Sequence, residues 1–300
     1  MSDFPSQRLA IATSVIIPGI HPDDAHLAVA LQRLGIEPTA CVWNDPHVDW
    51  SQFDAVLMRS TWDYFKHYAD FRQWLDQLPV PTINNKELLR WNSDKRYLLE
   101  LAQQGIDIIP TQLVAAPQLQ QTLAAMPAQE VVVKPTVSGT AQHTARGRSD
   151  DALFQQVVAQ LPLEFDYLVQ PYLPEVVTDG EWSLLFFEDE YSHAVIKRPA
   201  TGDYRVQGEF GGTAQAIEPD ATLIASAKRA LTAAAAIGHA DAAYARVDGV
   251  ISEGRFLLME LEMIEPCLHF EGRREAAERF AENLRKRLQA TSRNTHGVGR

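Results

Sequence analysis

Two pairs of charged residues lie close together in segment 244–262, near the C-terminal end of the chain. Arg246 and Asp248 are separated by one residue, and Glu260 and Glu262 are spaced in the same way. The segment has the pattern of two strands, in which side chains alternate between the two faces of a sheet. Each pair therefore shares a face, and the four side chains can form one charged cluster across a hairpin.

The turn between the two strands determines whether the pairs meet. A three-residue turn at Ser252-Glu253-Gly254 puts Asp248 opposite Leu258, on the face of the two glutamates. A two- or four-residue turn would put Asp248 on the other face. In a patch about 5 to 8 Å across, three carboxylates outnumber one guanidinium and repel one another unless a further cation joins them. Mg²⁺ carrying phosphates is the natural cation, with Mn²⁺ as an alternative, and the competing interpretation is a solvated hairpin.

Further upstream, two lysines and one loop are suited to binding phosphate. Lys95 lies near the start of a helix predicted at 94–104, where anions are favoured, and Lys134 lies near the end of a strand predicted at 130–135. Backbone amides of a small-residue loop can cradle phosphate, and such a loop follows the strand: Thr136-Val137-Ser138-Gly139-Thr140. Each feature is a weak signal by itself, because solvated lysines are common and this loop has a single glycine.

Two arginines and a glycine-containing loop lie between residues 198 and 212. Arg198 and Arg205 carry planar guanidinium groups, which match the geometry of a carboxylate or an acyl phosphate. The loop that follows has the composition of a mobile segment: Gly208-Glu209-Phe210-Gly211-Gly212. Such a loop can close over a site and exclude water, and an ordinary surface loop is the alternative. We predict Arg198 and Arg205 as catalytic residues, and Gly211 and Gly212 as contacts of the substrate.

The start of the chain has the pattern of an α/β unit. Strands predicted at 8–14, 38–43 and 54–60 alternate with helices predicted at 22–34 and 65–78. This order implies a parallel sheet with right-handed crossovers, in which ligands bind beyond the carboxyl ends of the strands. The third strand ends in a polar and aromatic run: Arg59-Ser60-Thr61-Trp62-Asp63. We interpret this run as a substrate-facing edge, with a polar connecting loop as the alternative.

The remainder of the chain predicts helices and antiparallel hairpins. Asn84 and Glu87 are spaced as a capping box at the start of a helix, and strands predicted at 181–187 and 191–197 form a hairpin. Neither a GxGxxG after the first strand nor a Walker GxxxxGK[ST] is present, which argues against the two commonest nucleotide-binding folds.

Composition limits the classes of partner. The chain has 300 residues, 46% of them hydrophobic, which is enough for two or three packed subdomains. It has no run of about 18 apolar residues, so we expect no membrane span. A formal net charge of -12 argues against nucleic acid as a partner. The only cysteines, Cys41 and Cys267, are far apart, which favours a reduced, cytoplasmic location. A homo-oligomer is left open.

Together these features resemble the ATP-grasp superfamily over nearly the whole chain. The motifs occur in the family's order: Asn92-Ser93-Asp94-Lys95, the strand Val131–Pro135, the hinge Gln170-Pro171-Tyr172-Leu173 and the charged hairpin. The resemblance implies an ATP-grasp fold, α/β at its start and α+β in its central and C-terminal parts. It divides the chain into a pre-ATP-grasp substrate domain (1–83), a lid-like central domain (84–175) and a C-terminal domain with the metal site (176–300).

The resemblance also implies roles for individual residues. In the family, two lysines bind ATP phosphates and the hinge backbone pairs with adenine, which corresponds here to Lys95, Lys134 and Leu173. Arg246 corresponds to the contact with the transferred phosphoryl group. The family's metal ligands, which hold one or two Mg²⁺ ions, correspond to Asp248, Glu260 and Glu262.

Two subgroups are the most similar. The stretch from Gln170 to Gly212 is similar to bacterial glutathione synthetase, although Glu262 stands where that enzyme type has asparagine and the phosphate loop has only Gly139. Three segments look most like cycloserine-pathway cyclo-ligases, which close a ring on O-ureido-serine: VWNDPHVDW, RSTWDY and LRWNSDKRYL.

The resemblance implies an ATP-dependent ligase that activates a small amino-acid-like substrate as an acyl phosphate and then forms a C–N bond. In the cyclo-ligases that bond closes a ring. The alternatives are a glutathione-synthetase-like peptide ligase, a small-molecule kinase and a non-catalytic nucleotide-binding module.

Overall fold

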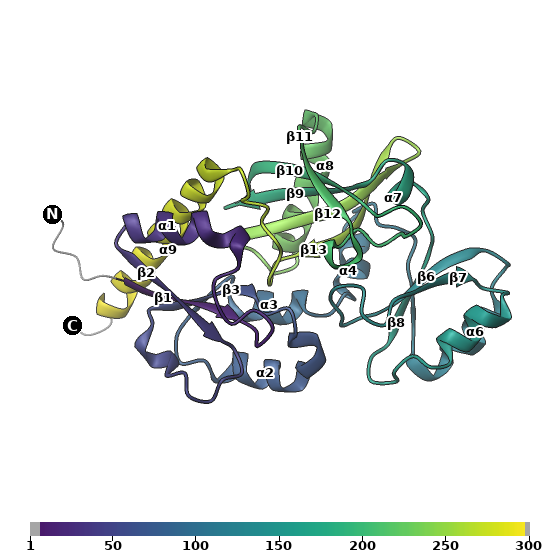
Figure 1. Cartoon of the computed structure of the whole chain (residues 1–300), viewed down its shortest axis with the longest axis horizontal. Coiled ribbons are helices and arrows are strands. Elements are labelled where there is room, and N and C mark those ends of the chain that lie inside the picture. The colour runs from purple at the N-terminus through teal and green to yellow at the C-terminus, as the bar shows by residue number, and fades with distance from the viewer. Residues whose placement is uncertain (1–6, 298–300) are drawn as a thin grey trace.

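The computed structural model describes residues 7–297, and three β-sheets follow one another along them (Figure 1). The first sheet is parallel, and the two later sheets are antiparallel. The expected class, α/β at the start and α+β afterwards, is therefore confirmed. Within the described residues, no helix is both long and apolar enough to cross a membrane.

The first sheet is built from the N-terminal part of the chain. Its strands are, in spatial order, β2 (Ile36–Val42), β1 (Gln7–Thr13), β3 (Ala55–Ser60) and β4 (Thr82–Ile83). The crossovers contain α1 (Ala25–Arg33) and α2 (Tyr68–Gln77), each preceded by a 3₁₀ turn, at Pro22–Asp24 and Tyr64–His67. Every residue of β3 is buried, as expected for a strand of a parallel sheet covered on both faces.

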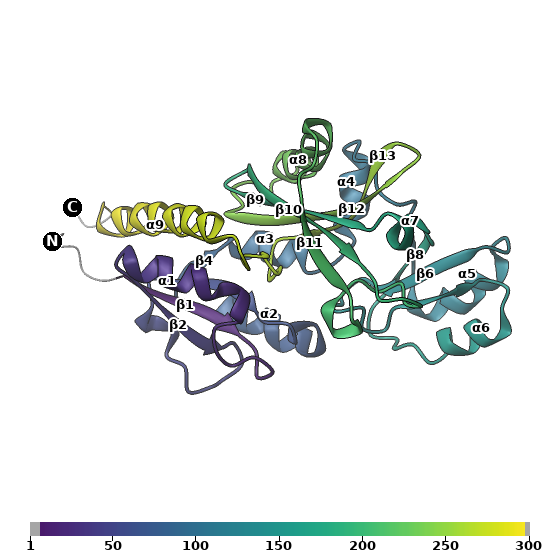
Figure 2. The same ribbon diagram turned by 45° about the horizontal axis from the view of Figure 1, so that its top comes forward.

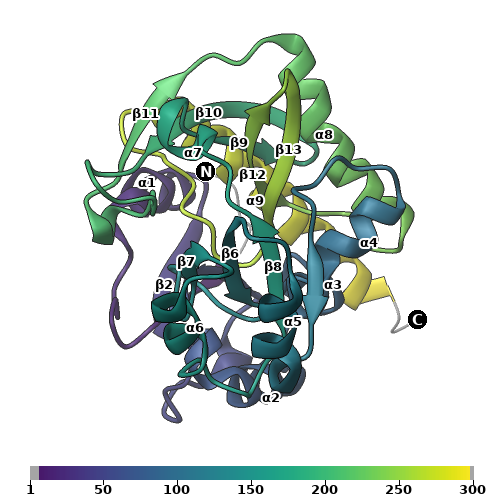
Figure 3. The same cartoon turned by 90° about the vertical axis from the view of Figure 1, so that its right-hand side faces the viewer.

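The central part is a smaller antiparallel sheet with two helices. The strands are, in spatial order, β5 (Gln112–Val114), β8 (Tyr167–Pro171), β6 (Glu130–Pro135) and β7 (Ala145–Arg148). The helices are α5 (Leu119–Ala125) and α6 (Ala152–Val158), and Figure 3 shows this part nearest the viewer. It has its own hydrophobic cluster, which includes Leu123, Val131 and Phe154.

The largest sheet has five strands. They are, in spatial order, β11 (Thr213–Ile217), β10 (Glu190–Arg198), β9 (Glu181–Phe187), β12 (Tyr244–Ser252) and β13 (Arg255–Glu262). The remaining helices before the C-terminal one are α3 (Lys86–Asn92), α4 (Tyr97–Gln103), α7 (Glu175–Thr178) and α8 (Ala221–Ala236). Leu98 of α4 and Ala227 of α8 share one hydrophobic cluster with Leu184 of this sheet.

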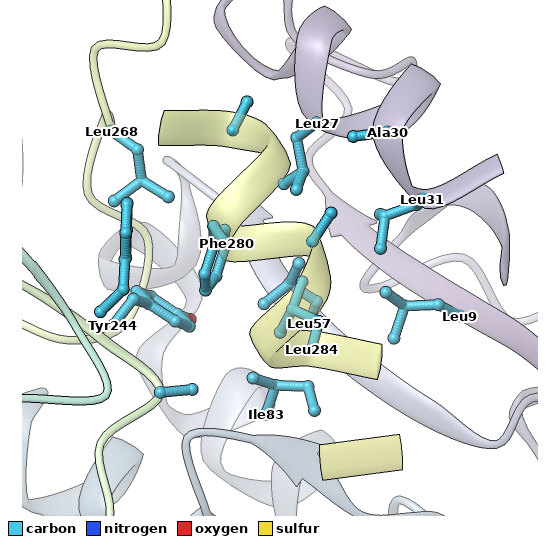
Figure 4. Packing of buried hydrophobic residues seen from close by; sticks show 14 of the residues in the cluster. Leu9, Leu27, Ala30, Leu31, Leu57, Ile83, Tyr244, Leu268, Phe280 and Leu284 are labelled. Atoms are coloured by element: carbon cyan, nitrogen blue, oxygen red, sulfur yellow. The ribbon is translucent and has the colours of Figure 1, made fainter. Parts of the chain in front are cut away.

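The last helix, α9 (Arg274–Gly297), returns to the first sheet (Figure 2). Its Phe280 and Leu284 share a buried cluster with Leu9 and Leu57 of the parallel strands (Figure 4). Tyr244 of β12 packs edge-on against Phe280, with ring centroids 5.7 Å apart. Elements therefore pack across the expected boundaries at 83 and 175, and the division into three domains remains a prediction.

The β12–β13 hairpin closes differently from the prediction. Ser252 pairs with Arg255, so the turn has two residues, Glu253 and Gly254, rather than three. Both have positive φ angles, 51° and 75°, which is the backbone geometry that two-residue hairpin turns favour. The predicted three-residue turn is therefore wrong. The two-residue turn is favoured because its backbone twist matches the right-handed twist of the two strands.

A β-bulge returns the carboxylates to one face. The register shifts by one residue between Asp248 and Gly249, so that Asp248 lies opposite Glu260 rather than opposite Met259, where the two-residue turn alone would place it. Met259 is the extra residue of the bulge. A Cβ on Gly249 would lie 2.5 Å from a carbonyl oxygen of β13, so this close approach of the strands requires glycine. The predicted shared face is therefore correct, although the predicted pairing is not.

The cap of α3 is one residue later than predicted. Asn85 is the N-cap, and its Oδ1 accepts a hydrogen bond from the backbone N–H of Leu88 at 2.9 Å. The predicted capping box of Asn84 and Glu87 is wrong, because Asn84 has a φ of 58° and its side chain is used elsewhere.

Asn84 cross-links the chain after the first sheet to the hairpin strands. Its side chain accepts from the backbone N–H of Ala243 at 2.7 Å. It also donates to the carbonyls of Tyr244 at 3.0 Å and Met263 at 2.7 Å. All these hydrogen bonds are buried, so the amide joins the parallel sheet to the wall of the charged cluster.

We expect Asn84→Ala to lower the free energy of unfolding by about 3 kcal/mol or more, because three buried backbone groups lose their partner together. Denaturant unfolding followed by circular dichroism measures this loss. The matched control is Asn85→Ala, which removes only a helix cap and should cost about 1 kcal/mol. Equal losses for the two variants would contradict the cross-link.

Candidate active site

A cavity of about 540 Å³ opens where loops of the first sheet meet the other two sheets. Most of the predicted site residues line it: Trp62, Lys95, Lys134, Ser138, Gly139, Gln170, Tyr172, Leu173, Arg205, Gly212, Arg246, Asp248, Glu260 and Glu262. The residues predicted separately for phosphate, hinge and metal therefore face one space, although they come from segments far apart in the chain.

Five of the predicted substrate residues are not part of the cavity lining: Arg59, Ser60, Thr61, Asp63 and Gly211. Arg59 is buried, and its guanidinium pairs with Asp24 at 2.9 Å. Asp63 is also buried and accepts a hydrogen bond from the indole N–H of Trp43 at 2.7 Å. These polar groups act inside the first sheet, and only Trp62 of the predicted run reaches the cavity.

Strand alternation separates two neighbouring cations of β10. Arg198, predicted as a catalytic residue, is exposed and donates to the carbonyl of Asp179 at 3.3 Å. Lys197 is buried and lines the cavity, where its ammonium pairs with Glu181 and lies 3.3 Å from Asp248. Strand alternation in the sequence already indicated this separation. Residues two apart, such as Arg246 and Asp248, share a face, whereas the neighbours 197 and 198 lie on opposite faces.

Asp248 lies buried within the charged cluster. Its Oδ1 accepts from Ser183 Oγ at 2.6 Å and from Arg246 Nε at 3.0 Å. Its Oδ2 accepts from Arg246 Nη2 at 2.9 Å and from Lys197 Nζ at 3.3 Å. Burial alone would raise the pKa of Asp248, but the two cations outweigh burial and hold that pKa well below its usual range. The carboxylate is therefore ionised, and both of its oxygens have partners.

Glu260 and Glu262 are more accessible, each with 29% of its side chain exposed. Glu260 pairs with Lys134 at 3.1 Å, and Glu262 pairs with Arg246. Burial, together with the charges of Asp248 and Glu260, raises the pKa of Glu262 to about 7 in spite of Arg246. Burial also acts to raise the pKa of Glu260, but Lys134 and Lys95 together outweigh it and the net shift is downward. Near neutral pH Glu262 is therefore only partly ionised, and a further cation beside it would favour its charged form.

The donor set fits a hard divalent cation in part. Among the described residues, no group of three or more carboxylate, histidine or cysteine side chains is arranged to hold a metal ion. Glu260 and Glu262 nevertheless face the cavity with carboxylate oxygens, the ligand type that Mg²⁺ prefers. Asp248 can join them only if the side chains of Arg246 and Lys197 turn away from its oxygens.

Lys95 is held against the predicted phosphate loop. Its ammonium donates to the backbone carbonyl of Ser138 and lies 3.3 Å from Ser138 Oγ. Its backbone N–H donates to the carbonyl of Thr136 at 2.7 Å. The lysine and the loop therefore form one unit, in which a phosphate could take the place of the carbonyl as partner of the ammonium.

The hinge runs beside an apolar part of the cavity wall. Gln170 donates to Thr111 Oγ1 at 2.8 Å, which anchors the segment at the end of β8. Leu173 packs against a buried cluster that includes Ile109 and Val176, and all three line the cavity. An apolar wall with a few polar groups beside it suits a planar heterocyclic base.

Comparison with known proteins identifies the family. The family described as "D-cycloserine synthetase DcsG, N-terminal domain" matches residues 9–84. Over 299 residues the chain is 35% identical to the cycloserine biosynthesis protein DcsG of Streptomyces lavendulae, with 94% of this chain and 99% of that protein covered. The chain belongs to the DcsG family. The crystal structure of D-cycloserine synthetase DcsG matches with a TM-score of 0.82 and 33% identity, over 94% of this chain and 99% of that one.

The DcsG family shares its fold with other ATP-grasp ligases. D-alanine–D-alanine ligase from Bacillus anthracis, complexed with ATP, matches with a TM-score of 0.62 and 14% identity over 98% of this chain and 100% of that one. The ATP-grasp ligase PsnB, complexed with a phosphomimetic variant of its minimal precursor, Mg and ADP, matches with a TM-score of 0.60 and 14% identity over 96% and 99%. These two likenesses show the fold alone. With the family assignment, they confirm the expected ATP-grasp fold and ligase class.

Glu265 and His269 are cavity residues that the sequence reasoning missed. Burial and the charge of Glu262 raise the pKa of Glu265 to about 8, and its backbone carbonyl accepts from the indole N–H of Trp62 at 2.9 Å. Burial lowers the pKa of His269, and its Nε2 is buried without a hydrogen-bond partner among the described residues. Both residues lie beyond the end of β13, where strand alternation no longer predicts a facing direction.

We expect Glu265→Gln to stabilise the ligand-free protein at alkaline pH. The pKa of this carboxyl is about 8 in the folded chain against an ordinary 4.5, so its contribution to stability is lost as pH rises between these values. The compared quantity is the free energy of unfolding of the variant minus that of the parent. Allowing for partial exposure, this difference should be about 2 kcal/mol more favourable to the variant at pH 8.5 than at pH 5. Thermal unfolding at the two pH values measures the gain, and Glu271→Gln, an exposed residue of the same segment, is the control. Parallel melting curves for Glu265→Gln and the parent would contradict a buried carboxyl.

Proposed function

We propose that this chain is an ATP-dependent ligase that activates the carboxylate of a small amino-acid-like substrate as an acyl phosphate and then joins it to a nitrogen. Cyclisation of an O-ureido-serine-type substrate towards cycloserine is the first candidate reaction. The observation that carries the proposal is the cavity wall in which four cations and three carboxylates meet: Lys95, Lys134, Lys197, Arg246, Asp248, Glu260 and Glu262. The family match supports the cycloserine-type reaction.

The cations answer the main physical difficulty of the first step. A triphosphate and a carboxylate repel each other, and phosphoryl transfer depends on positioning and charge neutralisation more than on covalent help. In this proposal Lys95 and Lys134 hold phosphate oxygens, and Arg246 moves from Asp248 to the transferred phosphoryl group. Lys197, already in the same wall, neutralises charge beside it.

In the same proposal Glu260 and Glu262 would hold Mg²⁺, and Asp248 would join them once Arg246 and Lys197 have turned away from its oxygens. Mn²⁺ is the alternative ion. When bound, the ion neutralises charge on the phosphates. Binding requires the Glu262 carboxyl to be ionised, which its pKa of about 7 permits near neutral pH.

The second step needs a nitrogen nucleophile, a proton acceptor and exclusion of water. We infer that Glu265 takes the proton of the attacking nitrogen, because its pKa of about 8 is suited to a base working near neutral pH. Arg205 and Gly212 belong to a loop that lines the cavity and can shield the acyl phosphate. Adenine lies along the Gln170–Leu173 hinge in this proposal, and Trp62 faces the substrate.

In this proposal each of the three predicted domains has its own role. Residues 1–83 select the substrate, 84–175 cover the nucleotide, and 176–300 hold the metal. Both cysteines, Cys41 and Cys267, are free, which supports a role in the reduced cytoplasm.

An ADP-release screen over small amino acids, including O-ureido-serine, tests the function. We expect ADP and free phosphate to form together in the presence of Mg²⁺, and Glu260→Gln to lower the rate by about 100-fold or more. Because cycloserine lacks the carbamoyl group of O-ureido-serine, ring formation with that substrate would also consume one water molecule and release the carbamoyl group as ammonia and carbon dioxide. Glu190→Gln, at an exposed position of β10, is the matched control.

The same screen separates the competing functions. Phosphate retained on an organic product would identify a kinase. No stimulation of ADP formation by any acid and amine would leave a nucleotide-binding module as the better description. Turnover of Glu260→Gln near the parent rate would refute the metal assignment.

Substitutions at Lys197 and Arg198 test which of these two neighbouring cations acts in the site. We expect Lys197→Met to lower kcat for ADP formation by about 100-fold, because it removes a buried positive charge beside Asp248. Lys197→Arg keeps the charge and should retain more activity. Arg198→Ala, one residue away on the exposed face, should stay within about twofold of the parent enzyme. The reverse order of effects would favour the original assignment of Arg198.

A further inference from the structure

The segment between β10 and β11, residues 199–212, forms a lid loop beside the cavity. Val206 anchors it in a buried apolar cluster. The Arg205 guanidinium pairs with Asp203 at 2.7 Å and lies 3.6 Å from the centroid of the Phe210 ring. A Cβ on Gly212 would collide with the backbone of Val206, so the loop closes tightly on itself. These internal contacts make the lid loop one unit rather than a flexible tether.

Arg146, on β7 of the central sheet, reaches this loop. Its guanidinium lies 3.4 Å from the centroid of the Tyr172 ring and 5.3 Å from that of Tyr204. Tyr172 belongs to the hinge and Tyr204 to the lid loop, and both line the cavity. Glu130 of β6 pairs with the same guanidinium at 2.8 Å. We refer to Arg146, Tyr172 and Tyr204 as the arginine clasp.

The clasp depends on the shape of the guanidinium as well as on its charge. A planar cation can stack on aromatic faces, whereas a lysine ammonium is a compact, strongly hydrated charge. Only 27% of the Arg146 side chain is exposed, so its contacts with the rings are partly shielded from water. The ion pair with Glu130 keeps the guanidinium on the central sheet while its face points to the rings.

We propose that Arg146 is a positioning residue that ties the lid loop to the hinge and so limits the loss of the activated intermediate to water. The inference rests on the proposed function, because it assumes an acyl phosphate under the lid. Water that enters the site hydrolyses the acyl phosphate, which yields phosphate and regenerates the free carboxylate. ATP would then be consumed without ligation. The arginine clasp therefore bears on the efficiency of coupling more than on the rate of phosphoryl transfer.

The first test needs no substrate. Chymotrypsin cuts after tyrosine and phenylalanine in extended segments, so it cuts faster after Tyr204 and Phe210 when the lid loop leaves the protein surface. We expect Arg146→Ala to raise the initial rate of cleavage at these sites about five- to tenfold, the effect of losing a partly buried cation–π contact. Arg146→Lys should resemble Arg146→Ala, because it keeps the charge and loses the flat stack. Tyr204→Phe keeps both the ring and the protease site and should match the parent.

The second test uses the substrate pair found in the ADP screen. We expect Arg146→Ala to increase the ratio of ADP formed to product ligated about fivefold, with little change in the KM for ATP. Tyr204→Ala should have the same effect, and the double variant should be no worse than either single one. Arg148→Ala is the matched control, since Arg148 lies on the same strand, is exposed and pairs with Asp150.

The outcomes are distinct from those that test the ligase itself. Cleavage of Arg146→Ala at the parent rate, or an unchanged ratio of ADP to product, would overturn the clasp while the ligase assignment stood. Absence of ADP formation with every acid and amine would refute the ligase, and the cleavage rates would still report whether the arginine clasp holds the lid loop.

Discussion

Compensation of buried negative charge is the constraint on which the site depends. Asp248 has only 2% of its surface exposed, and an unpaired carboxylate at such a depth would be protonated or would destabilise the fold. Arg246 and Lys197 hold it ionised, and each of these cations also pairs with a second carboxylate, Glu262 or Glu181. The cluster is therefore a network of shared partners. In the proposed function, incoming phosphates and a metal ion exchange with these partners, so that no charge is left without one.

That network requires accurate placement of β13, and buried polar side chains of the preceding helical segment provide it. Asn92 donates to the carbonyl of Leu261 and accepts from the N–H of Met263, both at 2.7 Å. The hydroxyl of Tyr97 accepts from the N–H of Leu261 at 3.0 Å. Because Lys95 lies between Asn92 and Tyr97 in the chain, the same contacts hold this lysine, the proposed phosphate ligand, beside the carboxylates. The pairings leave these buried backbone groups satisfied, so they stabilise the wall while they position it.

The cavity also depends on a core shared between distant segments. Helix α9 completes the packing of the parallel sheet, and Tyr244, in the strand that carries Arg246 and Asp248, packs against it. The hydroxyl of Tyr244 donates to the carbonyl of Ile264 at 2.7 Å, in the stretch that leads to Glu265. A loss of packing in the first sheet would therefore reach the charged wall of the third through one aromatic residue.

The sequence by itself determined the α/β start and the shared faces of the two charged pairs, because period-two alternation and strand ends are local properties. The resemblance to ATP-grasp proteins singled out Lys95, Lys134 and the hinge, and all of them line the cavity. The sequence also contained the distinction between Lys197 and Arg198, which the same alternation explains. Only the tertiary structure decided that a two-residue turn and a bulge at Met259 together return Asp248 to the face of Glu260. A bulge offsets the register by one residue, and pairing between strands, rather than the pattern along either strand, determines where that offset occurs. Likewise, Arg59 pairs with Asp24 in the core, and Arg146 meets Tyr204, through contacts between segments that are distant in sequence. Neither contact could be predicted from local pattern.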